Sequence, residues 1–219
     1  MSRPSRDRRQ RFHGHIAGVG TEEGTRFVVG VWDRSPLGAF ADVMVERPDG
    51  RRILLAPDER VARFVAGTYR FDEVHQVPVR VSRPAGAARG TPGGDWSVRA
   101  GPLEATFGVG GGTALGRLLR LQPPGVSLTR GWALAVSPLA RLVLPGVRTV
   151  GTAGGGRREW YSARHEHRIV TVRAAWDGDD LGGLRPVSPP PAFGFSSTPA
   201  RPSLVRVVST VELVADHAP

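Results

Sequence analysis

Two pairs of histidines, each with one residue between its members, are the feature of this sequence best suited to metal chemistry. The first pair is His13 and His15, and the second is His165 and His167. Residues i and i+2 of a β-strand point to the same face, so each pair would present two imidazoles to one point. If the two strands are neighbours, the four rings predict a transition-metal site.

Glu159 and Tyr161 would share a strand face with the second histidine pair and are further candidate ligands. The alternative is that these histidines are solvated or stacked, because Arg164 and Arg168 flank them. No spacing places the two strands side by side, and the pattern does not complete a cupin-type metal motif. A histidine-dependent metalloprotein or metalloenzyme is therefore one hypothesis; it is the only one that needs a cofactor, and no catalytic residue is assigned.

A glycine triplet followed by arginines is the second feature that could do chemistry. Backbone N–H groups of residues 154–156 and the guanidinium groups that follow them could hold an anion. The candidate ligand-binding residues in and after this segment are Arg157, Arg158, Trp160, Tyr161 and Arg164. The alternative is a plain flexible hairpin loop, because the pattern that follows is typical of a strand, whereas nucleotide-binding loops lead into a helix.

The composition excludes several classes of chemistry. The sequence has 30 Lys and Arg residues together, and every one of them is arginine; cysteine and asparagine are absent as well. Without lysine there is no Schiff base and no P-loop, and without cysteine there is no thiolate nucleophile, disulfide or iron–sulfur cluster. What remains is binding or catalysis by arginine, histidine, carboxylate and hydroxyl groups.

The charge distribution indicates an anionic partner. The formal net charge is +10, and no acidic residue lies between Glu104 and Glu159. An apolar, purely cationic segment of this kind would suit a small apolar anion such as a fatty acid, or an anionic membrane surface. The alternative is a pair of core-packed helices whose arginines extend to solvent. Nucleic acid is a further candidate partner, through the basic residues 1–11 and the arginine-rich strand.

Period-two patterns dominate the segments that must position these residues. Strands are predicted over 27–32, 41–46, 53–55, 71–81, 96–100, 103–109, 158–174 and 204–214. A short helix capped by Asp58 and ended by Gly67 is predicted between them, with further helices after Thr113 and over 129–144. We therefore expect a mainly β, antiparallel barrel or sandwich of about nine or ten strands with two or three short helices.

The chain length of 219 residues suits one domain. Residues 1–11 are predicted to be a disordered basic tail, and residues 12–219 a single β-rich domain. The tail has no apolar core of the kind that a signal peptide needs, and no apolar run is long enough to span a membrane. A cytoplasmic location is the expectation, and the sequence does not indicate an oligomeric state.

Three segments resemble an uncharacterised group of actinobacterial proteins of similar length. They are residues 35–42 (SPLGAFAD), 154–161 (GGGRREWY) and 193–199 (FGFSSTP). The resemblance covers most of the chain and implies no known activity. The tail from residues 175–178 (AWDG) through residues 207–210 (VVST) is also similar to the end of acetoacetate decarboxylases. That family works through a lysine Schiff base, so the resemblance implies at most a non-catalytic relative.

The leading hypothesis is therefore non-catalytic binding of a small apolar, anionic ligand inside a β-barrel. Barrels of about eight strands can enclose one small ligand. Arg157, Arg158 and Arg164 are predicted to hold its anionic end. A solid interior with no cleft beside the glycine triplet would contradict this hypothesis.

Overall fold

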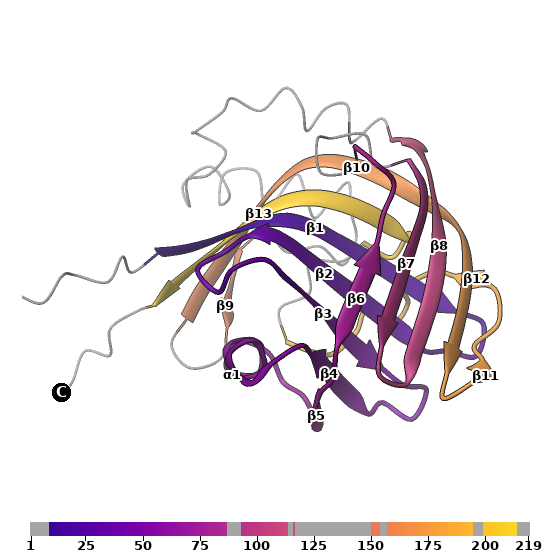
Figure 1. Ribbon diagram of the computed structural model, residues 1–219, viewed down its shortest axis with the longest axis horizontal. Helices are drawn as coiled ribbons and strands as arrows, with labels where there is room; N and C mark the ends of the chain where they lie inside the picture. Colours follow the sequence, from indigo (N-terminus) through magenta and orange to yellow (C-terminus); the bar gives the residue numbers. More distant parts are fainter. Residues whose placement is uncertain are drawn as a thin grey trace, which may run out of the picture.

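The structure is a computed structural model, which describes residues 9–86, 93–113, 116, 150–153, 157–194 and 199–213. One curled sheet dominates it (Figure 1). The strands are β1 Arg9–Thr21, β2 Arg26–Arg34, β3 Phe40–Glu46, β4 Arg52–Ala56, β5 Glu73–Gln76, β6 Val79–Ser82, β7 Gly94–Ala100, β8 Leu103–Gly112, β9 Val150–Ala153, β10 Arg157–Trp176, β11 Asp179–Asp180, β12 Leu184–Arg185 and β13 Ser203–Leu213. The main path of the sheet runs β5-β4-β3-β2-β1-β13-β10-β8-β7-β6.

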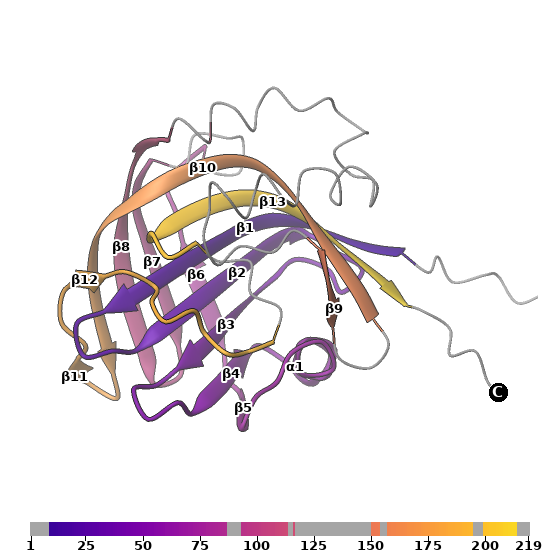
Figure 2. The same cartoon turned by 180° about the vertical axis from the view of Figure 1, so that it is seen from behind.

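The two edge strands of this path, β5 and β6, are consecutive in the chain. The sequence pattern predicts one strand over 71–81, and this prediction is wrong at Val77 and Pro78, which separate β5 from β6. Proline has no N–H to donate to a ladder, so the strand cannot continue through it in a central position. The chain instead crosses from one edge to the other, and the sheet curls into a half-barrel (Figures 1 and 2).

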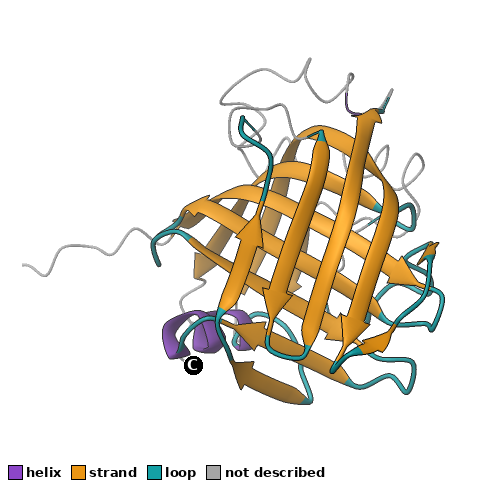
Figure 3. Ribbon diagram, turned by 45° about the vertical axis from the view of Figure 1, so that its right-hand side comes forward, coloured by secondary structure: helices purple, strands orange, loops and turns teal. Residues whose placement is uncertain are grey.

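The walls of the half-barrel cross at a steep angle. Strands β6, β7 and β8 lie over β1, β2 and β3 and run across them (Figure 3). All pairings in the main path are antiparallel except that of β4 with β5, which is parallel. The expected all-antiparallel barrel or sandwich is therefore corrected to a mixed, curled sheet, because the helix between β4 and β5 makes the crossover that a parallel pair needs.

An apolar core fills the space between the walls. The hairpin of β7 and β8 contributes Trp96, Val98, Ala100, Leu103, Ala105, Phe107 and Val109, which are the side chains that its alternation predicts to point inward. Phe27, Val29 and Val43 from the opposite wall are fully buried against them. In this part of the described structure, the interior consists of packed side chains.

Helix α1 Glu59–Ala66 covers the outward face of β4. The Asp58 side chain accepts a hydrogen bond from the Val61 backbone N–H at 2.9 Å, which is the predicted cap. Leu54, Val61 and Val65 form a second, smaller core under the helix. This is the one helix that the described residues contain in full, against two or three predicted.

Other sequence predictions meet the structure only in part. Strand β1 begins at Arg9, inside the segment expected to be a tail. Thr113 accepts a hydrogen bond from the Gly116 N–H at 2.8 Å, as a helix cap does, but residues 117–149, including the helix predicted over 129–144, lie outside the described residues. Among the residues that are described, no helix has the length and apolar character needed to cross a membrane.

Candidate functional site

His15 lies inside the half-barrel, on the face of β1 that carries Ala17 and Val19. Only 1% of the residue is exposed, and its ring meets Trp96 of β7 edge to face, with centroids 5.4 Å apart. Neither ring nitrogen has a hydrogen-bond partner in the described part of the chain. A buried imidazole with both nitrogens unpaired is costly, because water satisfied them in the unfolded chain.

The two predicted histidine pairs lie on strands that are separated by one strand, β13. In the ladder, His15 is opposite Arg206, and Arg206 is opposite His165. His13 is opposite Val208, and His167 is opposite Leu204. The structure thus brings His15 and His165 into one row of the sheet, with a guanidinium between them.

Arg83 and Asp33 form an ion pair beside His15. Arg83 Nη2 donates to Asp33 Oδ1 at 2.6 Å, and the Arg83 Cζ atom lies 6.0 Å from the centre of the Trp96 ring. Arg83 Nη1 is buried and has no hydrogen-bond partner among the described residues. Trp96 is therefore in contact with two groups that have unpartnered nitrogens in the described structure. One is the imidazole of His15, and the other is the guanidinium of Arg83, whose Nη1 atom has no partner.

The surroundings hold His15 in its neutral form. Burial lowers the pKa of His15 to about 4, Asp33 opposes this, and the positive charges of Arg83 and Arg206 lower it further. His165 adds to the lowering. A neutral imidazole can donate one hydrogen bond and accept another, so His15 is available to an uncharged or anionic partner.

We call this cluster the interior polar site. It consists of His15, Asp33, Arg83, Trp96, His165 and Arg206. No group of three or more His, Asp or Glu side chains with metal-binding proximity occurs among the described residues. The charged members instead favour an anion, since the charges of two guanidinium groups, those of Arg83 and Arg206, and of one carboxylate act on His15.

Trp160 and Tyr161, predicted to bind a ligand together, point to opposite faces of β10. Trp160 is buried, with the Arg9 guanidinium 5.8 Å from its ring centre. Tyr161 instead bonds to Tyr69, which follows α1. Arg164 lies at an irregularity of the ladder between β10 and β13. Arg157 and Arg158 are the first residues of β10, and their side chains, like residues 154–156, lie outside the described part.

Glu159 belongs to a buried network on the outward face. Its Oε2 accepts a hydrogen bond from the Tyr69 hydroxyl at 2.7 Å, and its Oε1 accepts one from the Ser209 hydroxyl at 2.7 Å. The Tyr69 and Tyr161 hydroxyls are 2.5 Å apart. Burial, followed by the charge of Glu159, raises the pKa of Tyr69 well above its ordinary value, so its phenol stays protonated and donates. Both carboxylate oxygens are satisfied, and the network fastens α1 to the β10–β13 ribbon.

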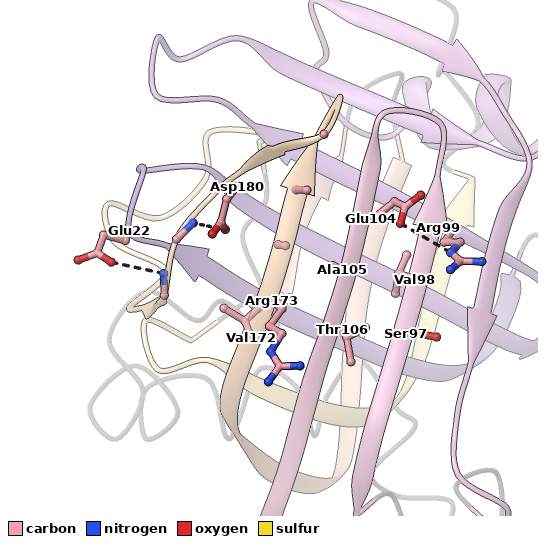
Figure 4. Close-up of a pocket in the computed structure, with 15 residues that line it drawn as sticks. Glu22, Ser97, Val98, Arg99, Glu104, Ala105, Thr106, Val172, Arg173 and Asp180 are labelled. Atoms are coloured by element: carbon pink, nitrogen blue, oxygen red, sulfur yellow. Dashed lines mark hydrogen bonds and ion pairs between the residues drawn. The ribbon is translucent and has the colours of Figure 1, made fainter.

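A surface depression of about 730 Å³ lies on the outward side of β7, β8 and β10 (Figure 4). Ser97, Thr106 and Arg173 form one row across the three strands. Arg99 of the next row approaches Glu104 at 3.8 Å, and its side chain is 77% exposed. Mixed charge and exposure make this depression a weaker candidate for a small ligand than the interior polar site, where the polar atoms are desolvated.

Sequence reasoning found His15 and His165 but missed their partners. Asp33 is the next-to-last residue of β2 and Arg83 directly follows β6, so both lie just beyond the strands predicted over 27–32 and 71–81. Trp96 was assigned to the interior correctly. The alternation of 204–214 puts the apolar Val205 and Val207 on one face of the strand and Arg206 on the other, so it does not indicate an inward arginine; in the structure Arg206 shares the face of Leu204, which belongs to the core. Only the pairing of β1 with β13 shows that it meets His15.

Comparison with known proteins assigns no family. No protein-family model and no curated protein matches this chain. A solved structure from Nitrosomonas europaea, provisionally named AttH, aligns with 96% of this chain and 53% of its own, at 12% identity and a TM-score of 0.33. The chain thus spans about half the length of that protein. The absence of family and curated matches is consistent with an uncharacterised family.

Proposed function

We propose that this protein binds a small amphipathic anion, such as a medium-chain carboxylate, at the interior polar site. One observation carries the proposal: the nitrogens of His15 and the Nη1 atom of Arg83 are buried without partners, and both side chains contact Trp96. Native proteins pair almost all buried polar atoms, so a cluster of unpaired ones indicates a position that another molecule satisfies.

The charges of the site favour an anion. Arg83 and Arg206 each carry one positive charge, while Asp33 supplies one negative charge and His15 is neutral. Arg206 makes no ion pair with any residue in the described ranges and lies in the row between the two histidines. One positive charge is left over, which suits a monoanion and disfavours a metal cation at the same place.

The surroundings favour an apolar body on that anion. Trp96 stacks on Phe107 with ring centroids 6.2 Å apart, and both belong to the apolar core. Both rings are at most 1% exposed, so the alkyl chain of a carboxylate held near the arginines would have to part packed side chains to lie against them. The carboxylate would gain charge-assisted hydrogen bonds, and the chain would gain hydrophobic contact.

A fluorescent fatty acid tests the proposal. Purified protein is titrated with 11-(dansylamino)undecanoic acid, and the dansyl emission is followed to saturation. We expect saturable binding that weakens at least about tenfold in Arg83→Gln and in Arg206→Gln, because each removes a charged partner. Arg173→Gln, on the outward face, changes the net charge equally and should leave the affinity unchanged.

Two results would contradict the proposal. One is the absence of saturable binding and of any co-purified anion in native mass spectrometry. The other is equal weakening in all three arginine variants, because that would indicate attraction by the overall charge and not by a site.

A further inference from the structure

Asp33 occupies one side of the guanidinium that the ligand needs. On the basis of the proposed function, we infer that Asp33 is an internal competitor that must give up or share Arg83 when an anionic ligand binds. Asp33 thereby sets how strongly the interior polar site prefers an anion to a neutral molecule of the same shape.

Arg83 has one Nη atom with a hydrogen-bond partner and one without in the described structure. Its Nη2 atom donates to Asp33 at 2.6 Å, while its Nη1 atom is buried and unpaired in the described structure. A carboxylate binds arginine best through two parallel hydrogen bonds. Because Nη2 has two N–H donors, an incoming carboxylate that takes both Nη atoms of Arg83 must either displace Asp33 or share Nη2 with it.

The position of the pair allows this exchange. The Arg83 side chain is 27% exposed and that of Asp33 is 34% exposed, so the pair lies between the buried His15 and solvent. An aspartate released from Arg83 can be hydrated there, and its release does not strand a charge in the core. A partly exposed ion pair also contributes little stability, so opening it costs little.

Asp33 must also weaken any anion that binds while it stays in place. Two carboxylates on one guanidinium repel each other, and Asp33 is close enough to His15 to raise the pKa of that imidazole. A neutral ligand feels no such repulsion. Asp33 should therefore lower the affinity for an anion and leave that for an alcohol nearly unchanged.

The opposite role is that Asp33 orients Arg83 for the ligand. In that case its removal would weaken anion binding, since the guanidinium would lose its anchor. The two roles predict changes of opposite sign, and one substitution decides between them.

The experiment compares octanoate with 1-octanol by isothermal titration calorimetry. For each protein, the ratio of the two dissociation constants measures the preference for the charged head group. We expect Asp33→Asn to tighten octanoate binding about fivefold to tenfold and to change octanol binding less than about twofold. Arg83→Gln should lower the preference below that of the wild type.

Asp95→Asn is the matched control. Asp95 is exposed and pairs across the ladder with Gly108, so its substitution removes one negative charge outside the interior polar site. The preference should not change. A general loss of packing in Asp33→Asn would change the dissociation constants of both ligands alike, whereas relief of competition would change only that of octanoate.

The outcomes separate the inference from the proposed function. If the wild type binds octanoate through Arg83 and Arg206 but Asp33→Asn leaves the preference equal or lower, the inference is wrong and the proposed function stands. If neither the wild type nor Asp33→Asn binds octanoate or octanol, the proposed function itself is wrong.

Discussion

The imidazole of His15 and the indole of Trp96 meet across the interior of the half-barrel, with ring centroids 5.4 Å apart and planes inclined by 61°. His15 belongs to β1 and Trp96 to β7, two strands that do not pair with each other. The contact therefore joins opposite walls. It also marks the place where the apolar interior gives way to charged and polar groups, including Asp33 and Arg83.

His15 should make the stability of the protein depend on pH. Its pKa is lowered from 6.5 to about 4 in the folded protein. Between these pH values the unfolded chain binds a proton that the folded chain does not, so His15 destabilises the fold as the pH falls. The effect grows to about 3 kcal/mol and is complete below the folded pKa. We expect His15→Phe to remove this loss.

Urea unfolding at pH 7 and pH 4.5 measures the effect. The free energy of unfolding of His15→Phe minus that of the wild type should be about 2 kcal/mol larger at pH 4.5 than at pH 7. His75→Gln is the control, because the side chain of His75 is 39% exposed. An unchanged difference between His15→Phe and wild type at the two pH values would show that His15 is not desolvated.

Asp42 should produce the opposite pH dependence. Burial raises the pKa of Asp42 from 3.8 to about 7, and the hydrogen bond from Trp32 opposes this only in part. The folded chain therefore holds a proton that the unfolded chain releases, and stability is lost as the pH rises from about 4 to about 7. The loss is about 4 kcal/mol.

Asp42→Asn keeps the acceptor for Trp32 and removes the titration. We expect its stability relative to the wild type to increase between pH 4.5 and pH 7, by urea unfolding at both values. In the wild type, Asp42 and His15 act in opposite directions over this range and offset each other. A double variant with His15→Phe should show neither effect, and persistence of the Asp42 effect in Asp42→Asn would contradict the assignment.

Local pattern was enough to predict most strands. Alternation placed the seven inward residues of the β7–β8 hairpin correctly, since each strand has one face on the core. The α1 helix followed from Asp58 and from the spacing of Val61 and Val65. These signals act within a few residues, and no tertiary contact overrides them here.

The candidate site could not be predicted in the same way, because it depends on which strands pair. His15 and Arg206 are far apart in the sequence, and only the β1–β13 ladder places them opposite each other. The prediction for Trp160 and Tyr161 is wrong in the opposite way, because it joins two residues that the structure separates. The sequence predicts one site for these adjacent residues, yet neighbouring residues of a strand point to opposite faces. The crossing of the chain from β5 to β6 at Pro78 also depends on which strands pair, so the alternation over 71–81 does not show it.

Gly30 should be essential for the hydrogen bond between Trp32 and Asp42. Trp32 Nε1 donates to Asp42 Oδ1 at 3.0 Å, and a Cβ atom on Gly30 would lie 2.6 Å from Oδ1 and 2.8 Å from Nε1. Gly30→Ala should therefore break this bond and destabilise the protein by about 1–3 kcal/mol. Urea unfolding followed by tryptophan fluorescence measures it. Gly111→Ala is the control, because a Cβ there meets nothing within 4 Å, and equal effects of the two would contradict the prediction.

The buried ion pair of Arg26 and Glu46 should tolerate loss of both partners better than loss of one. Arg26 Nη2 is 2.5 Å from Glu46 Oε1, and the two side chains are 9% and 7% exposed. Glu46→Ala leaves a buried guanidinium and removes the acceptor of the Ala192 N–H, so we expect a loss of about 3–5 kcal/mol by urea unfolding. The double variant Arg26→Met with Glu46→Leu should recover much of this loss.

An exposed ion pair provides the comparison for Glu46. Arg63 and Glu59 are paired on α1 with side chains 73% and 70% exposed. Glu59→Ala should cost no more than about 0.5 kcal/mol, because solvent screens the pair. A loss in Glu46→Ala as small as this would mean that the Arg26 guanidinium finds water when its partner is removed.

Tyr69→Phe should loosen the attachment of α1 to the sheet. The Tyr69 hydroxyl donates to Glu159 at 2.7 Å and lies 2.5 Å from that of Tyr161, so its removal takes one donor from a buried carboxylate and the partner from a second phenol. We expect a loss of about 1–3 kcal/mol by urea unfolding. Tyr161→Phe removes the bond between the two phenols and leaves the Tyr69 bond to Glu159 in place, so it should cost less. In the double variant the second substitution should add little, because Tyr69 connects Tyr161 to Glu159; additive losses would mean that the two hydroxyls do not interact.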